Sequence, residues 1–161
     1  MWKNHIIRLY VIKMKEHKHL GCYGLLIEGN KILLIKKKTG PYDGLLDLPG
    51  GSLEFGETPE IALKREFMEE TGLDITKYKL YDANSVKVEW KYDADTNIMV
   101  HHVGIFYKIL DYKNEIKKKV NIDSKNDDSL GAELYEISKL KKDDVSAITL
   151  IELEKLGYIL K

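Results

Sequence analysis

The chain has 161 residues, which is enough for one domain with a sizeable core, and we expect a single domain over residues 1–161. Its 26 basic and 26 acidic side chains cancel, so the net charge favours neither a nucleic acid nor an anionic membrane as a partner. The only cysteine, Cys22, excludes an intramolecular disulfide, and no apolar stretch is long enough to span a membrane. We therefore expect a cytoplasmic protein.

Runs of β-branched, aromatic and aliphatic residues predict strands along most of the chain. These runs cover residues 6–14, 23–27, 31–35, 79–90, 101–110 and 133–137. Gly29 and Asn30 tolerate positive φ, so they predict a hairpin turn between the second and third strands. Loops are expected at residues 38–44, 91–97 and 124–129. The short run 45–48 leads into Pro49-Gly50-Gly51, where the backbone must bend sharply or approach a ligand.

Two segments predict helices. Thr58 suits an N-cap and Pro59 the first helical position, while Gly72 suits the C-terminal cap, so we expect a helix between them. A second helix is expected over residues 144–156 because their apolar residues have partly helical spacing. Strands around one acidic helix, with another helix at the end, predict a mixed α/β fold.

The most informative segment is GSLEFGETPEIALKREFMEETGL, residues 51–73, which contains six acids. On a helix, Glu66, Glu69 and Glu70 project from one face because they stand at i, i+3 and i+4. Two like charges about 4 Å apart repel by about 1 kcal/mol in water and about 4 kcal/mol at a protein surface. A hard cation with oxygen ligands removes this repulsion, and Mg²⁺ bound by a few carboxylates usually also holds substrate phosphates.

A solvated acidic face with i,i+4 ion pairs is the alternative interpretation of this segment. Glu60 and Lys64 form such a pair. The positions four residues after Glu66, Glu69 and Glu70 hold no basic residue, so these three acids do not fit that alternative.

The same segment resembles the Nudix box of the MutT-like Nudix hydrolases. That pattern is glycine, five residues, glutamate, seven residues, then Arg-Glu-apolar-any-Glu-Glu-any-Gly-apolar. Every specified position is filled, by Gly51, Glu57, Arg65, Glu66, Phe67, Glu69, Glu70, Gly72 and Leu73. Phe67 is a mild departure, because the family usually has an aliphatic residue there. The resemblance implies an α/β/α sandwich with a mixed β-sheet and a loop–helix–loop metal site.

By position, the resemblance implies that Glu66, Glu69 and Glu70 are carboxylate ligands of Mg²⁺, with Mn²⁺ as a substitute, and that the carbonyl of Gly50 is a backbone ligand. Arg65 is expected to orient the site through a bidentate bond to a carboxylate, for which Glu57 is the candidate. A direct contact between Arg65 and a phosphate is the alternative. Glu57 would then lie behind the ligands or bind an additional metal ion.

The implied reaction is hydrolysis of a nucleoside diphosphate linked to another moiety, by a metal-activated water that gives its proton to a carboxylate. Glu66 is our candidate for this base, which makes Glu66, Arg65 and Glu57 the predicted catalytic residues. Family members differ in where the base lies, so Asp127, Asp128 and Glu133 remain alternatives.

Three further residues are predicted to contact substrate, each with an alternative. Lys37 lies in a basic run that suits a phosphate chain, and the alternative is a solvated charge at the end of an exposed strand. Tyr107 suits nucleobase stacking, although aromatic residues on strands are more often packed against neighbours. Asp128 lies where relatives often carry an acid that contacts the metal or the base. The alternative is that Asp128 only forms a turn. His101 and His102 are adjacent on a strand and face opposite sides, so we expect packed or surface residues there.

Two functional classes remain. The first is a Mg²⁺-dependent enzyme acting on a nucleoside triphosphate, an oxidised nucleotide or a nucleotide sugar such as ADP-ribose. The second is a non-catalytic Nudix-like sensor or regulator that binds a nucleotide. The intact box favours the enzyme. We expect a small nucleotide as partner, with no membrane and no nucleic acid, and the sequence leaves a homodimer open. Selectivity lies in loops such as 38–44, which carry no readable code for the substrate.

Overall fold

A computed structural model describes residues 13–117 and 129–161. The predicted strand 6–14 and the predicted loop 124–129 lie almost entirely outside these residues. Asp127 and Asp128, which include a predicted substrate contact and two candidate bases, lie outside them as well.

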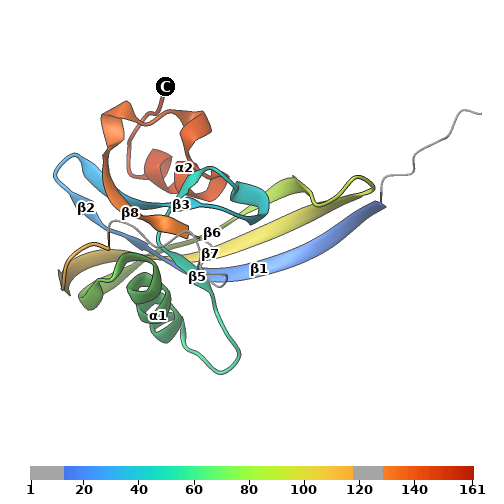
Figure 1. The fold of residues 1–161 in the computed structure, drawn as a ribbon. Coiled ribbons are helices and arrows are strands. Elements are labelled where there is room, and N and C mark those ends of the chain that lie inside the picture. Colours follow the sequence, from blue (N-terminus) through green and yellow to red (C-terminus); the bar gives the residue numbers. More distant parts are fainter. Residues whose placement is uncertain (1–12, 118–128) are drawn as a thin grey trace, which may run out of the picture.

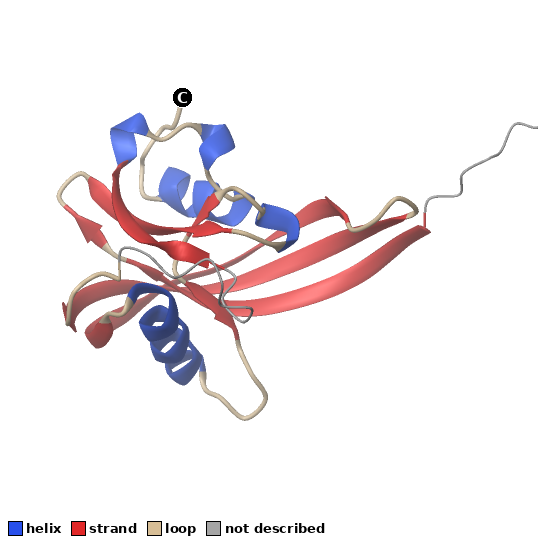
Figure 2. Cartoon of the chain, in the orientation of Figure 1, coloured by secondary structure: helices blue, strands red, loops and turns tan. Residues whose placement is uncertain are grey.

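The strands form two four-stranded sheets, drawn in red in Figure 2. The first sheet has the order β5-β1-β7-β6. Its strands are β1 (Lys13–Leu25), β5 (Gly50–Ser52), β6 (Asp74–Lys91) and β7 (Thr96–Lys113). Because β1 and β7 run parallel while the other pairs are antiparallel, this sheet is mixed.

The second sheet is built around β3 and is antiparallel throughout. Its strands are β2 (Ile27–Glu28), β3 (Lys31–Lys37), β4 (Leu46–Asp47) and β8 (Ser129–Glu136). The predicted hairpin turn is present, since Glu28 pairs with Lys31 and Gly29 has a φ of 60°. Strand β8 starts earlier than the predicted segment 133–137.

Two strands are much longer than the sequence pattern predicted. β6 and β7 each contain 18 residues and pair along most of their length, where shorter strands at 79–90 and 101–110 were expected. The turn between them is confined to residues 92–95. Polar residues interspersed at both ends of these strands hid their extent, although Ile75 near the start of β6 is buried in a hydrophobic cluster.

The helices lie on opposite sides of the sheets, with α1 (Pro59–Thr71) below and α2 (Ala147–Lys155) above in Figure 1. Thr58 caps α1 by accepting a hydrogen bond from the backbone N–H of Ile61, and Gly72 ends the helix at a φ of 77°. Helix α2 begins later than predicted, because residues 142–144 form a separate 3₁₀ turn and Ser146 is the cap. The predicted α/β fold with a mixed sheet between helices is confirmed.

Each helix packs on its own hydrophobic cluster, which fixes the helix relative to the strands. Helix α2 contributes Ile148 and Leu153 to one cluster, and α1 contributes Leu63 and Phe67 to the other. Phe67 fits because Gly24 on β1 lacks a side chain, and a Cβ there would lie 2.5 Å from the ring. Within the described residues, no helix is long and apolar enough to cross a membrane.

Two shorter 3₁₀ segments complete the described fold. They are η1 (Gly40–Tyr42) and η2 (Ile137–Lys139). The first lies inside the predicted loop 38–44 and carries Tyr42 into the hydrophobic interior.

Candidate functional site

A cavity of about 840 Å³ collects most of the residues that the sequence singled out. Its walls come from β1, β5, β7, helix α1 and the segment around η1. Of the predicted site residues it is lined by Lys37, Gly50, Arg65, Glu66, Glu69 and Glu70. The volume falls in the range of pockets that enclose small organic ligands.

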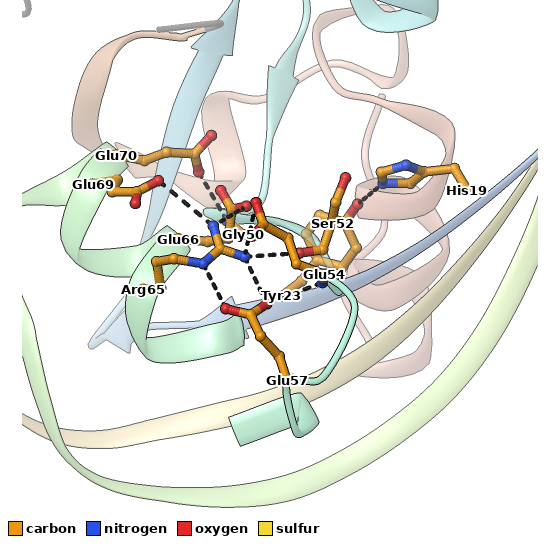
Figure 3. Close-up of polar contacts among 10 residues, drawn as sticks. All are labelled: His19, Tyr23, Gly50, Ser52, Glu54, Glu57, Arg65, Glu66, Glu69 and Glu70. Carbon is orange, nitrogen blue, oxygen red and sulfur yellow. Dashed lines mark hydrogen bonds and ion pairs between the residues drawn. The ribbon is translucent and has the colours of Figure 1, made fainter. Parts of the chain in front are cut away.

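Arg65 holds the acidic wall of this cavity together (Figure 3). Its Nε donates to Oε1 of Glu57 at 2.7 Å and its Nη2 to Oε2 of Glu57 at 2.8 Å, which is the predicted bidentate bond. The remaining nitrogen, Nη1, donates to Oε1 of Glu66 at 2.7 Å and lies 3.7 Å from Glu69. The planar guanidinium thus orients acids from both the loop and the helix.

The same contacts keep these groups charged. The Arg65 guanidinium holds the pKa of Glu57 down at about 2, and hydrogen bonds from Arg65 to Glu57 and Glu66 raise the pKa of Arg65. Glu57 also accepts a hydrogen bond from the backbone N–H of Glu54 at 3.0 Å. Glu57 therefore ties the loop before α1 to the helix, and it does so as an ionised carboxylate at neutral pH.

Two glycines bring the backbone of β5 close to the acids of α1. The N–H of Gly50 donates to Oε2 of Glu70 at 2.8 Å, and Glu70 is 3% exposed. Gly50 has a φ of 144°, and a Cβ on it would lie 2.2 Å from the carbonyl oxygen of Cys22. A Cβ on Gly51 would lie 2.6 Å from the Glu66 carboxylate. Side chains at either position would fill the space beside the acids.

The donor set fits a hard divalent cation in its chemistry. Glu66, Glu69 and Glu70 offer carboxylate oxygens on one wall, and Gly51 leaves space at the Glu66 carboxylate. Across residues 13–117 and 129–161, no three His, Cys, Asp or Glu side chains are grouped closely enough to hold an ion as they stand. Two of the three acids contact Arg65 and the third contacts Gly50, so binding an ion requires these carboxylates to turn.

A second wall of the cavity was not predicted, and we call it the neutral wall because the side chains of Tyr23, Tyr42 and His102 are uncharged. Tyr23 of β1, Tyr42 of η1 and His102 of β7 line it, and His19 lies beside them. His102 is 3% exposed, and burial lowers its pKa to about 3, with the positive charge of His19 and Lys37 acting in the same direction. His102 is therefore neutral at physiological pH. The sequence indicated only that His101 and His102 would be packed or surface residues and that the loop containing Tyr42 would affect selectivity.

A buried carboxyl group at the base of the cavity links it to helix α2. Oδ1 of Asp47 accepts hydrogen bonds from the hydroxyls of Ser146 and Thr149, at 2.6 and 2.8 Å, and from the N–H of Leu48 at 2.9 Å. Burial raises the pKa of Asp47, and these hydrogen bonds oppose that shift. Nothing in the local sequence around Asp47 predicts this contact, since its partners lie about a hundred residues away.

The remaining predicted residues lie away from the cavity or outside the described chain. Tyr107 is buried in the α1 cluster, where its hydroxyl donates to Oε1 of Glu60 at 3.1 Å, so its position favours the packing alternative. Glu133 is exposed on β8 and does not line the cavity, which leaves this candidate base without contact to the acidic wall. Glu57 acts on the cavity through Arg65, and Asp128 lies outside the described residues.

Comparisons with known proteins identify the family of this chain. A family model for the NUDIX domain matches residues 15–151. An ADP-ribose pyrophosphatase of Methanocaldococcus jannaschii is 36% identical over 135 residues, covering 84% of this chain and 69% of that protein. An 8-oxo-dGTP diphosphatase of Proteus vulgaris is 30% identical over 107 residues, covering 65% of this chain and 87% of that protein.

A solved structure supports the same relationship. The MutT NUDIX hydrolase from Burkholderia pseudomallei superposes with a TM-score of 0.62 at 26% identity, covering 87% of this chain and 98% of that one. The chain belongs to the Nudix family. The predicted enzyme class, a Nudix hydrolase that cleaves phosphoanhydride bonds, is confirmed, and members of this class generally use divalent metal ions.

Proposed function

We propose that this chain is a Mg²⁺-dependent hydrolase, with Mn²⁺ as a substitute, that cleaves the phosphoanhydride bond of a nucleoside diphosphate linked to another moiety. The observation that carries the proposal is the placement of Glu66, Glu69 and Glu70 with Gly50 on one wall of a cavity large enough for a nucleotide. Acids clustered there without a cation would repel both one another and a phosphate chain.

In this proposal the carboxylates of Glu66, Glu69 and Glu70 and the carbonyl of Gly50 hold the metal. A metal ion bound there supplies charge neutralisation of phosphate oxygens and an acidified water. Arg65 keeps the Glu66 carboxylate in place through the 2.7 Å bond and is itself fixed by Glu57.

The proton of the attacking water goes to a carboxylate, for which Glu66 is the described candidate. Asp127 and Asp128 remain the alternatives outside the described residues. Lys37, which lines the same cavity, would contact the phosphate chain.

ADP-ribose is the substrate we place first. Of the two relatives described above, the ADP-ribose pyrophosphatase is aligned over the longer stretch, 135 residues against 107. The second relative, an 8-oxo-dGTP diphosphatase, makes an oxidised nucleoside triphosphate the second candidate. Both are small nucleotides, in agreement with the zero net charge of the chain, which gives no general attraction to a nucleic-acid polymer.

The test is a product-release assay with ADP-ribose, 8-oxo-dGTP and ordinary nucleoside triphosphates, each with Mg²⁺, Mn²⁺, Zn²⁺ or excess chelator. We expect AMP and ribose 5-phosphate from ADP-ribose with Mg²⁺ or Mn²⁺, less turnover with Zn²⁺, and none in chelator. Full turnover in chelator would remove the metal proposal. Nucleotide binding by calorimetry without turnover of any compound would replace the enzyme with the sensor.

A further inference from the structure

The neutral wall of the cavity contains a continuous chain of side-chain contacts. Nε2 of His19 lies 3.0 Å from the hydroxyl oxygen of Tyr23, and that oxygen lies 2.7 Å from Nε2 of His102. Nδ1 of His102 lies 3.0 Å from the hydroxyl oxygen of Tyr42. We call these four residues the His–Tyr chain, and all four line the cavity that holds the acids.

The fold builds this arrangement closely around the hydroxyl of Tyr23. A Cβ on Gly21 would lie 2.5 Å from that oxygen, so only glycine leaves space for it there. The rings of His19 and His102 meet edge to face with centroids 4.8 Å apart. Tyr23, Tyr42 and His102 are all buried, which fixes their rotamers and leaves few ways to satisfy their polar atoms.

A neutral imidazole carries one N–H and one lone pair, and both ring nitrogens of His102 face a tyrosine hydroxyl. One tyrosine must therefore donate to His102 while the other accepts from it. If the proton is on Nδ1, Tyr42 accepts from His102 and its own O–H can donate into the cavity. If the proton is on Nε2, Tyr42 donates to His102 and presents only lone pairs to the cavity.

We propose that the His–Tyr chain is the specificity-determining wall of the site, and that the Tyr42 hydroxyl binds a sugar hydroxyl of the substrate. This inference rests on the proposed function for the identity of the substrate. A sugar hydroxyl both donates and accepts, so it can pair with Tyr42 in either arrangement of the chain. Tyr42 and His102 line the same cavity as the acids that would hold the diphosphate, and they offer aromatic surface and uncharged polar groups of the kind that suit a sugar.

Tyr42 is the residue that touches the sugar in this account, and Tyr23 and His102 are positioning residues that act through it. A site built to hydrogen-bond a hydroxyl discriminates strongly against a ligand that lacks it, because the buried protein group is then left unpaired. A wall that only fills space would not distinguish such ligands.

The experiment compares ADP-ribose with analogues in which one sugar hydroxyl at a time is replaced by hydrogen. For the parent protein we expect kcat/KM to fall at least about tenfold for one analogue. For Tyr42→Phe we expect ADP-ribose and that analogue to be used equally, within about twofold. Tyr112→Phe is the control, since its hydroxyl donates to Glu28 outside the cavity, and it should keep the parent's ratio.

A second comparison tests the chain itself. If Tyr23 acts only through His102 and Tyr42, Tyr23→Phe should reduce the discrimination, and adding it to Tyr42→Phe should change nothing more. The inference would be overturned if the effects of Tyr23→Phe and Tyr42→Phe on this discrimination multiplied in the double variant. It would also be overturned if Tyr42→Phe kept the parent's ratio of kcat/KM between ADP-ribose and every analogue. If the parent hydrolyses none of these compounds, the ratio of dissociation constants from calorimetry replaces kcat/KM, so the chain is tested independently of hydrolysis.

Discussion

The two walls of the cavity differ in charge, because one gathers carboxylates and the other buries uncharged polar side chains. The acidic wall places Glu66, Glu69 and Glu70 on one helix face, where Arg65 contacts the first two and the N–H of Gly50 contacts Glu70. The neutral wall buries two tyrosines and a histidine and satisfies them through one another. The first wall carries several carboxylates and suits a cation with its phosphates, whereas Tyr23, Tyr42 and His102 on the second wall are uncharged and suit an uncharged group. The comparison suggests that chemistry and selectivity are separated within one cavity.

The largest effect should come from removing one charge on the acidic wall. Glu66→Gln keeps the size and helix propensity of the side chain but removes a metal ligand and the candidate base. We expect kcat to fall by about 10²–10⁴-fold with a much smaller change in substrate affinity. Glu60→Gln on the same helix is the control, because Glu60 contacts Tyr107 and does not line the cavity.

A nearly normal Glu66→Gln enzyme would place the base elsewhere. Asp128→Asn then becomes the informative variant: loss of its activity would move the base into the segment before β8, whereas a few-fold change fits a turn-forming residue. Steady-state kinetics on ADP-ribose with saturating Mg²⁺ separates these outcomes.

Arg65→Lys should have the next largest effect. Lysine keeps the positive charge but cannot make the bidentate hydrogen bond to Glu57 and also donate to Glu66. Loss of one charged hydrogen bond, worth about 1.5–3 kcal/mol, should lower kcat by roughly 10–100-fold. A rise in KM at constant kcat would support the alternative that Arg65 contacts a phosphate directly.

Burial of His102 in the neutral wall predicts that the stability of the folded protein depends on pH. The pKa of His102 is lowered to about 3 in the folded protein, below its ordinary 6.5, so the unfolded chain takes up a proton first as pH falls. His102 stabilises the fold fully above pH 6.5, and this stability is lost between about 6.5 and 3, by up to about 1.4 kcal/mol per pH unit.

Urea unfolding of the parent and of His102→Gln measures this effect. The difference in pH dependence between the two proteins should appear between about pH 6.5 and 5, above the range in which most carboxylates titrate. Parallel curves for the two proteins would show that His102 takes up its proton as readily in the folded chain as in the unfolded one.

The smallest expected effect concerns Glu69 without metal. Glu69 is 60% exposed and only 3.7 Å from Arg65, so its charge contributes little to the metal-free fold. We expect Glu69→Gln to shift the metal-free melting temperature by less than about 2 °C. The parent should gain stability in millimolar Mg²⁺, and the variant should gain less. An equal gain in both proteins would mean that Glu69 is not a ligand.

The acidic wall could be predicted from sequence because its geometry is local. Glu66, Glu69 and Glu70 share a helix, and Thr58, Pro59 and Gly72 mark where that helix starts and ends. The bond between Arg65 and Glu57 spans only eight residues and was predicted from the family pattern. The helix limits and the acidic face followed from spacing alone.

The neutral wall could not be predicted in this way because its contacts are long-range. Tyr42 and His102 are separated by 60 residues, and Tyr23 and His102 by 79. Tyr23 and His102 meet because β1 and β7 pair in parallel over 13 residues, with His19 opposite His102, and Tyr42 reaches His102 from η1. A parallel register between distant strands has no short sequence signal.

The most direct test of the separation between the two walls is Mn²⁺ binding measured by calorimetry in the parent, Glu69→Gln and Tyr42→Phe. The account predicts that Glu69→Gln weakens Mn²⁺ binding by about tenfold or more and that Tyr42→Phe leaves it within about twofold of the parent. Equal weakening by both variants, or no weakening by Glu69→Gln, would contradict the claim that the acidic wall alone holds the metal.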